Sequence, residues 1–375
     1  MNNIETIICL MLLLMALPDL CRKLGHPALT NVFFVVFGLA LGAFLDKDVN
    51  TMLKEAGEVG FLLVLFEVGL EIDLPKFREL LPSLRFAVLW SLVQYPLVLA
   101  LANVAGLTLL ESLLAAAALT SCAMSMTHQA WKNYPGLPGT SRNFVLQIMV
   151  ALEMLTIVVL SIDSATVKTG LGWGILFQVA GMAVTVFLIS RFAAHLIKLF
   201  QHIIAKTTHW RVHFLVLLVL AICAIGERLG LSAPKTAFFL GLFMGRTQFE
   251  GKSMEEYIAP ISRRFLIPIF FVSLGLLIDV RMLFSHAALL ALCGSLLFLG
   301  VREVLHRRWF KTGGDAQAYL LLCPNLTMAA LAAKVMFETG SHEAATWVVL
   351  SGLFLSVISL LLLPRLKGEA AAHEA

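Results

Sequence analysis

Glu153 is the residue whose type and position most clearly point to chemistry. It is the only acidic residue in the apolar stretch from 142 to 162. A membrane-spanning helix over this stretch would hold the carboxylate near the midplane of the bilayer, which costs about 3 kcal/mol. Because a carboxylate binds either a proton or a small cation through the same oxygens, we predict an ion- or proton-binding site. The alternative is a structural carboxylate held by Arg302 or by backbone donors at a helix break.

The composition places this carboxylate in a membrane protein. The chain has 375 residues, of which 59% are hydrophobic and 14% charged, and its mean hydropathy is +0.88. Such values exclude a soluble globular domain, and no ten-residue segments alternate as the strands of an outer-membrane barrel do. The sequence therefore predicts an all-α polytopic membrane protein in the lipid bilayer.

Apolar runs and their polar breaks predict thirteen transmembrane spans. Placing the N-terminus outside and the C-terminus in the cytoplasm puts all but seven of the 28 Lys and Arg residues on the cytoplasmic side, as the positive-inside rule requires. The expected spans are 3–20, 27–45, 56–72, 83–105, 108–126, 142–162, 171–195, 212–227, 234–249, 264–278, 285–305, 315–337 and 342–364.

Several classes of function lack their motifs. There is no phosphate-binding loop or dinucleotide fingerprint, so we expect no transport powered by nucleotide hydrolysis in this chain and no nucleic-acid partner. No Ser/His/Asp grouping or metal-ligand cluster indicates an enzyme. The six cysteines have neither Cys-x-x-Cys spacing nor zinc spacing, so we expect buried packing residues and no cofactor.

An internal repeat organises the chain. Residues 25–42 (GHPALTNVFFVVFGLALG) are similar to residues 230–245 (GLSAPKTAFFLGLFMG), and residues 69–73 are similar to 275–279. The matching spans run in opposite directions across the bilayer, so the repeats are inverted. Inverted repeats are typical of secondary transporters, whose site lies near the midplane and is built from interrupted helices. We expect one transporter domain over 1–366, divided into an extra first helix (1–24), a first repeat (25–165), linker helices (166–229) and a second repeat (230–366), with a short cytoplasmic tail over 367–375.

Two spans are expected to be discontinuous. Pro324 removes a backbone donor and should break the span 315–337. The repeat carries Ser121 onto Thr327, so the span 108–126 should break as well, although it has no proline there. The alternatives are a simple kink at Pro324 and hydroxyl groups that bond back to the preceding turn.

Four features together resemble the monovalent cation:proton antiporters, in particular the bacterial sodium/proton and potassium-efflux exchangers. They are LFEVGLEID at 65–73, ERLGLS at 227–232, FFVSLGLLID at 270–279 and the acidic sixth span. The resemblance implies an elevator-type fold in the bacterial inner membrane. A core of spans 4–6 and 11–13 would move against a dimerising scaffold, and the broken spans 5 and 12 would cross beside the ion site.

The scaffold of that family would contain the two GxxxG motifs, which begin at Gly38 and Gly241 and allow close helix approach. We therefore expect a homodimer. The alternative is that these glycines pack within one monomer.

The ion-site motifs depart from the pattern of that family. Leu152-Glu153 stands where the family has a pair of polar or acidic residues, and residues 325–327 (NLT) stand where it often has Gly-Glu. Arg302 is the basic residue nearest to the embedded lysine of the family. With a single carboxylate, the simplest function is an electroneutral exchange of one Na+ or K+ for one H+.

The candidate site is the following set of residues. The ion- or proton-binding residues are Glu153, Thr120, Ser121, Asn325 and Thr327; the candidate charge partners are Arg302, Glu67 and Lys334; the helix break is at Pro324. Instead of acting as a charge partner, Glu67 could line a cavity or snorkel toward the membrane surface. Lys334 could instead form an intrahelical pair with Glu338. The competing functions are a membrane sensor or subunit that retains the fold without transport, and a sodium-coupled carrier of organic anions.

Overall fold

The computed structural model is helical over nearly all the residues that it describes. Those residues are 3–23, 29–45, 47–71, 77–132, 134, 137, 139–169, 180–181, 184, 191, 211–228, 233–245, 248–249, 252–278, 280–309, 315, 317–364. Of the thirteen expected spans, only 171–195 lies mostly outside this set, and so does the tail 367–375.

The chain divides into two compact units. Unit 1 comprises Met1–Leu14, Phe34–Lys76 and Leu171–Leu276, and unit 2 comprises Met15–Phe33, Phe77–Gly170 and Leu277–Ala375. Each unit therefore takes helices from both predicted repeats. The helices of spans 4–6 and 11–13, which the family resemblance assigns to the core, all lie in unit 2.

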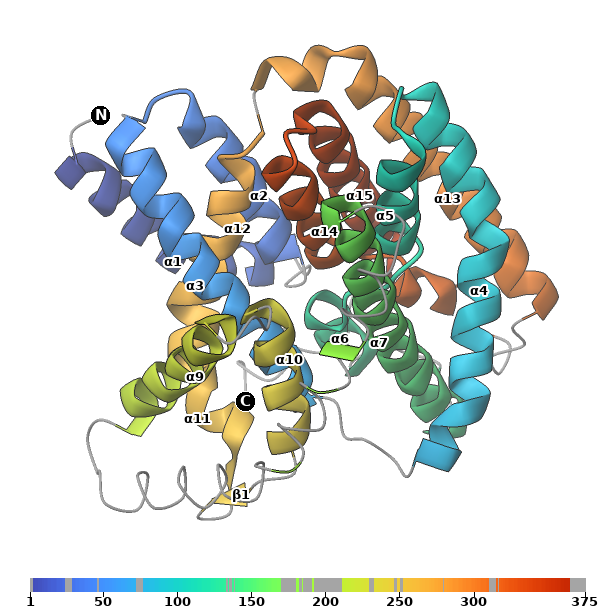
Figure 1. Cartoon of the computed structure of the whole chain (residues 1–375), viewed down its shortest axis with the longest axis horizontal. Helices are drawn as coiled ribbons and strands as arrows, with labels where there is room; N and C mark the ends of the chain where they lie inside the picture. The colour runs from blue at the N-terminus through green and yellow to red at the C-terminus, as the bar shows by residue number, and fades with distance from the viewer. Residues whose placement is uncertain are drawn as a thin grey trace. The chain divides into compact units, whose positions relative to one another are not determined.

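Unit 1 is built around α3 (Lys47–Glu71), which packs against α10 (Ala233–Met244) and α12 (Ile267–Gly275), as Figure 1 shows. Its other described helices are α9 (Arg211–Arg228), α11 (Met254–Ile261), the first part of α1 (Asn3–Lys23) and most of α2 (Thr30–Gly42). A ribbon of β1 (Gln248–Phe249) and β2 (Lys252–Ser253) pairs Gln248 with Ser253. The predicted ninth span, 234–249, is thus too long, because α10 ends at Met244.

Glycines let the helices of unit 1 touch through their backbones. A Cβ at Gly38 or Gly275 would clash where α2 meets α12, and a Cβ at Gly69 or Gly241 would clash where α3 meets α10. Gly38 corresponds to Gly241 in the predicted repeat, and Gly69 corresponds to Gly275. The two crossings are therefore repeat-related copies, and both GxxxG glycines are used in packing within one chain.

A short π-helix, η2 (Ser262–Leu266), runs directly into α12. Pro268, near the start of α12, has no N–H to donate and its ring would collide with the carbonyl four residues earlier. A wider turn before the proline relieves that collision, because the π-helical pattern bonds residues five apart.

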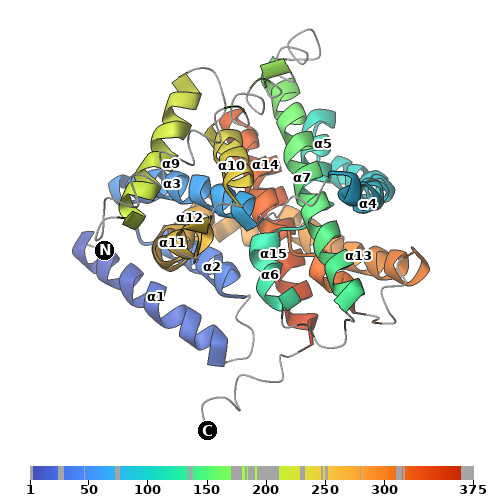
Figure 2. The same cartoon turned by 90° about the horizontal axis from the view of Figure 1, so that it is seen from below.

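Unit 2 is a bundle of helices in which α4 (Phe77–Val104) packs on α5 (Leu109–Leu119) and α7 (Gly139–Thr169). Figures 1 and 2 both show these three side by side. The second-repeat part contains α13 (His286–Trp309) and α14 (Leu326–Glu338), which both pack on α15 (His342–Leu362). The remaining elements are α6 (Met124–Lys132) and the 3-10 turns η3 (Val280–Phe284) and η4 (Ala318–Leu322).

Two spans of unit 2 are interrupted, as the sequence predicts. The helix α5, which begins with a capping box between Thr108 and Glu111, ends at Leu119, and α6 begins only at Met124. In the second repeat η4 ends at Leu322 and α14 begins at Leu326. The two interruptions touch, because the Ala123 N–H donates to the Pro324 carbonyl over 2.6 Å.

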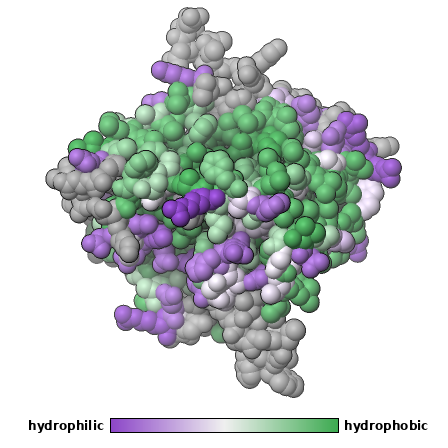
Figure 3. Space-filling view, turned by 90° about the horizontal axis from the view of Figure 1, so that it is seen from above, coloured by the Kyte–Doolittle hydropathy of each residue, from purple (hydrophilic) through white to green (hydrophobic). Residues whose placement is uncertain are grey.

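Within the described residues, five helical segments are long and apolar enough to cross a membrane: Leu81–Val104, Gly139–Leu160, His286–Trp309, Ala318–Glu338 and His342–Leu362. Shorter apolar helices cover Thr30–Gly42, Leu109–Leu119 and Arg264–Gly275. Apolar side chains dominate much of the face in Figure 3. On α4 and α13, exposed leucines such as Leu89 and Leu296 form surfaces suited to lipid.

Candidate functional site

Glu153 lies buried within unit 2. The side chain is 0% exposed, and so are those of Ala151 and Leu152 before it. Its helix α7 packs against α5 and α14, the two helices that border the interruptions. The carboxylate interacts electrostatically with the thiol of Cys122, within the first interruption. The structure thus brings the predicted carboxylate to the interrupted spans.

The hydroxyl groups of Thr120 and Ser121 bond back to the turn before them. Thr120 Oγ1 donates to the Ala116 carbonyl over 2.8 Å, and Ser121 Oγ donates to the Ala118 carbonyl over 2.5 Å. This is the alternative that the sequence left open for these residues. Both side chains are buried, and each hydroxyl oxygen keeps lone pairs with which it could accept from a donor or bind a cation.

Asn325 and Thr327 add oxygens from the second interruption. The Asn325 amide donates to the Leu119 carbonyl over 2.8 Å, and its backbone N–H donates to Ser356 Oγ over 3.1 Å. Among the described residues, Asn325 Oδ1 and Thr327 Oγ1 are buried without a hydrogen-bond partner. Amide and hydroxyl oxygens are suitable ligands for hard cations, so these two atoms could hold an ion.

Arg302 joins the ends of the two interrupted helices. Its guanidinium is 0% exposed and donates to the carbonyls of Leu119 (2.6 Å), Leu322 (3.1 Å) and Cys323 (3.3 Å). Its Nε donates to Gln94 Oε1 over 2.8 Å. The rings of Trp90 and Phe298 each lie 5.9 Å from the guanidinium carbon.

These contacts explain how the chain can stop two helices inside a bilayer. The last carbonyls of a helix have no partner within it and carry partial negative charge. In the described structure, Arg302 and Asn325 supply donors to the end of α5, and Arg302 supplies donors to the end of η4. The positive charge of Arg302 is offset by these carbonyls, while its role as a charge partner of Glu153 stays a prediction.

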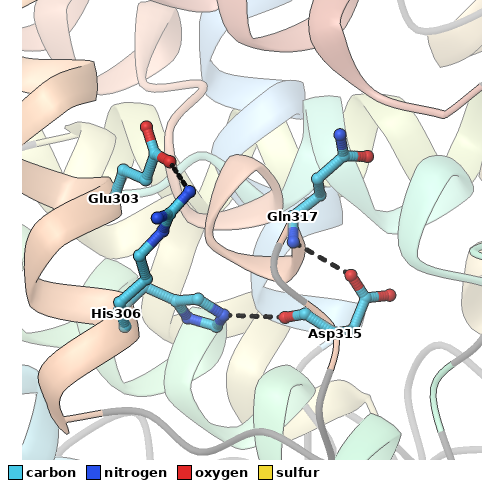
Figure 4. A network of polar contacts seen from close by, with 5 residues as sticks. Glu303, His306, Asp315 and Gln317 are labelled. Carbon is cyan, nitrogen blue, oxygen red and sulfur yellow. Dashed lines mark hydrogen bonds and ion pairs between the residues drawn. The ribbon is translucent and has the colours of Figure 1, made fainter.

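A polar network holds the segment before η4. In Figure 4, His306 Nε2 lies 2.8 Å from the Asp315 carbonyl oxygen, and the Gln317 N–H donates to Asp315 Oδ1 over 2.9 Å. The hydroxyl of Tyr134, between α6 and α7, donates to the same carboxylate over 3.1 Å. Burial and the neighbouring charge of Asp315 raise the pKa of Tyr134, so this hydroxyl keeps its proton. The network therefore ties a first-repeat loop to a second-repeat loop.

The other two candidate charge partners belong to the helices α3 and α14. Glu67 belongs to unit 1, where it is 4% exposed and accepts a 2.8 Å hydrogen bond from Ser262 Oγ of the π-helix. Its carboxylate is thus buried and does not snorkel to the surface. Lys334 is half-buried on α14, seven residues beyond Thr327 and on the same side of the helix.

Sequence reasoning missed Gln94, Tyr134 and Asp315. Gln94 had a usable signal, because it is a polar residue within an apolar span. Tyr134 and Asp315 had none, since their hydrogen bond joins positions far apart in the chain. In the described part of the chain, no group of three or more His, Cys, Asp or Glu side chains could hold a metal ion.

Comparisons with known proteins show what the chain is similar to. Residues 9–364 match the sequence model of a family described as sodium/hydrogen exchanger, transmembrane. A probable Na(+)/H(+) antiporter 3 of Methanocaldococcus jannaschii is 22% identical over 369 residues, which cover 92% of this chain and 91% of that protein. A putative K(+) efflux antiporter, KefB, of Alkalimonas amylolytica is 26% identical over 73% of this chain, but this chain spans only 42% of that protein.

The fold also matches a solved structure. The sodium proton antiporter MjNhaP1 from Methanocaldococcus jannaschii superposes with a TM-score of 0.69 at 14% identity, covering 96% of this chain and 95% of that one. This likeness confirms the predicted all-α polytopic fold.

Proposed function

Because the chain belongs to the sodium/hydrogen exchanger family, a family of transporters, we propose that it exchanges a monovalent cation for protons through a single carboxylate, Glu153. The observation that carries the proposal is the complete burial of Glu153 in the unit that contains both helix interruptions. A carboxylate in that position is stable when a proton or a cation neutralises it. Because the proton and the cation compete for the same carboxylate oxygens, the protein would carry one of them in each direction, which is an exchange.

The two interruptions would supply the other cation ligands. Asn325 Oδ1 and Thr327 Oγ1 are buried and have no hydrogen-bond partner among the described residues, which leaves their lone pairs for an ion. Thr120 and Ser121 direct their protons to backbone carbonyls, so their oxygens also face any ligand as acceptors. Oxygen ligands of this kind suit either Na+ or K+.

One carboxylate that exchanges one cation for one proton moves no net charge. We therefore propose an electroneutral exchange, with unit 2 as the part that carries the ion in an elevator-type movement. The support for unit 2 is that Glu153, Arg302 and both interruptions all belong to it. The protein would act as a homodimer, and since Gly38 and Gly241 are used in packing within unit 1, its interface would use other surfaces.

The test uses purified protein in liposomes with a pH-sensitive dye inside. Addition of Na+ or K+ outside should drive protons across the membrane at a rate that an imposed membrane potential leaves unchanged. Glu153→Gln should abolish this flux, because an amide cannot exchange a proton for a cation. Glu343→Gln, which changes an exposed carboxylate at the start of α15, serves as the matched control and should keep full flux.

Cation-driven proton flux that persists in Glu153→Gln would refute the mechanism. Wild-type protein that is correctly folded but gives no flux with Na+, K+ or Li+ would refute the exchange itself. A flux that changes with membrane potential would refute the electroneutral stoichiometry.

A further inference from the structure

Asp163 is a second acidic residue on the same helix as Glu153. The predicted sixth span ends at residue 162, which places Asp163 in a loop, but α7 continues to Thr169. Asp163 therefore lies within the helix, three residues beyond the apolar segment that ends at Leu160. The side chain is half-buried, and its Oδ2 atom is buried without a hydrogen-bond partner among the described residues.

Asp163 forms no ion pair with any residue that the structure describes. Tyr95 of α4 is a titratable neighbour with which Asp163 interacts electrostatically. On α5, the carboxylate of Glu111 accepts a 2.8 Å hydrogen bond from the Thr108 N–H. The helix α14 carries Lys334 and Glu338. The helix α6 meets α7 near its other end, where Trp131 donates to the Arg142 carbonyl.

Burial without a charged partner explains how Asp163 would respond to pH. A structural carboxylate at a buried position is normally held by a cation or by several donors. Asp163 has neither in the described structure, and burial raises its pKa to about 6. It would therefore gain and lose its proton in the range where the pH outside a cell varies.

The position of Asp163 relates it to the exchange site. Ten residues separate it from Glu153, which is about 15 Å along a helix axis. Thr156, a buried residue one turn after Glu153, lies on the same side of α7 as Asp163, seven positions earlier. A polar residue thus stands between the two carboxylates on the helix that carries both.

We propose that Asp163 is a further proton-binding residue of the transport cycle, which takes up protons at the C-terminal end of α7 on their way to Glu153. The inference rests on the proposed exchange function. A hydronium ion gives its proton to Asp163 Oδ2 and becomes water; water molecules between the two carboxylates then pass a proton on to Glu153 in the cation-free state, and Asp163 is again ionised. Only O–H bonds form and break. With the predicted orientation, this end of α7 faces outside.

The experiment compares wild type with Asp163→Asn, Asp163→Glu and the control Glu343→Gln in sided vesicles. The pH on one side is varied from 5 to 8 while the other side is clamped, and both vesicle orientations are measured. The wild-type rate should show a titration near pH 6 on the side of the α7 C-terminal end. Asp163→Asn should lose this titration and slow proton uptake several-fold from that side only, and Asp163→Glu should retain it.

An Asp163→Asn profile identical to wild type on both sides would overturn the proposal, and so would an equal loss from both sides. A separate measurement does not depend on transport: infrared spectra during pH titration should contain a protonated carboxyl band that Asp163→Asn removes. A midpoint near pH 6 for that band supports proton binding at Asp163 even if the exchange function fails, whereas a midpoint near the ordinary aspartate value of about 4 refutes it.

Discussion

The two units contain helix crossings of opposite character. In unit 1, α2 meets α12 and α3 meets α10 at glycines, where any Cβ would collide with the opposing backbone. In unit 2, the interrupted spans meet through the bond from Ala123 to Pro324, with Arg302 and Asn325 beside it. The same inverted repeat thus produces two kinds of helix crossing. The crossings in unit 1 depend on glycines, which have no side chain, and the crossing in unit 2 depends on polar side chains.

The difference teaches what each unit can do. Glycine crossings bring regular helices close together and leave no space for an ion or water, which suits a rigid support. Interrupted helices expose carbonyls and N–H groups inside the protein, where they must be satisfied by side chains or ligands. The charged and unsatisfied groups of the candidate exchange site therefore concentrate in unit 2.

Removing the charge of Arg302, where the two interrupted spans meet, should have the largest effect on the free energy of unfolding. Arg302→Met keeps the apolar length of the side chain but removes the Arg302 donors from four buried acceptors, of which, among the described residues, only the Leu119 carbonyl keeps a bond, from Asn325, so we expect a loss of about 3–5 kcal/mol. Arg302→Lys should lie between wild type and Arg302→Met, since lysine keeps the charge but lacks the planar fork of donors. Chemical unfolding in mild detergent measures the difference. Wild-type stability in Arg302→Met would show that the crossing does not depend on this charge.

Introducing a side chain at a glycine crossing of unit 1 should have the next largest effect on the free energy of unfolding. Gly241→Val forces α10 away from α3, at an expected cost of about 1–3 kcal/mol in the same unfolding measurement. Gly300→Ala is the matched control, because a Cβ at that position meets nothing within 4 Å. It should raise stability by about 0.5–1 kcal/mol through helix propensity. Equal changes in stability for Gly241→Val and Gly300→Ala would show that glycines at the crossings are no more important for packing than glycines elsewhere.

The network before η4 should matter less. Tyr134→Phe removes the hydrogen bond to Asp315 and keeps the ring, so we expect a loss of about 0.5–1.5 kcal/mol. In the double mutant with Asp315→Ala, the two losses should add incompletely, because each substitution alone already removes the bond between Tyr134 and Asp315. Fully additive losses would show that the two residues act separately.

The smallest expected effect concerns the pH dependence of stability. Because the pKa of Asp163 is raised in the folded state, its contribution to stability is complete below about pH 4 and is lost as the pH rises through about 6. Asp163→Asn lacks this loss and should unfold at the wild-type temperature near pH 4 but slightly higher at pH 7. The gain should stay under about 1 kcal/mol, since solvent screens a half-buried group. A gain that is larger at pH 4 than at pH 7 would contradict the sign.

The sequence predicted the features that depend on local chemistry. Glu153 stood out because of its apolar neighbours, and Pro324 marked its break because proline cannot donate. The break after α5 could be inferred only from the repeat, because the groups that satisfy its carbonyls, Arg302 and Asn325, are distant in the chain.

Other features were beyond a reading of local pattern. Asp163 looked like the start of a loop because the apolar run ends at Ile162, and hydropathy does not show whether the helix continues beyond it. The GxxxG glycines at Gly38 and Gly241 identified close crossings correctly, but a motif does not say which helix approaches it. The structure shows that Gly38 packs against α12 and that Gly241 packs against α3, each helix coming from the other repeat.

The glycine crossings also have a consequence for the order in which the protein is made. Gly38 enters the membrane early, but Gly275, which packs against it, is synthesised more than two hundred residues later. Until then, lipid must cover the surface of α2 that α12 will occupy. Neither repeat can complete unit 1 alone, so we expect a chain that ends after the first repeat to be degraded and to be rescued when the second repeat is produced beside it.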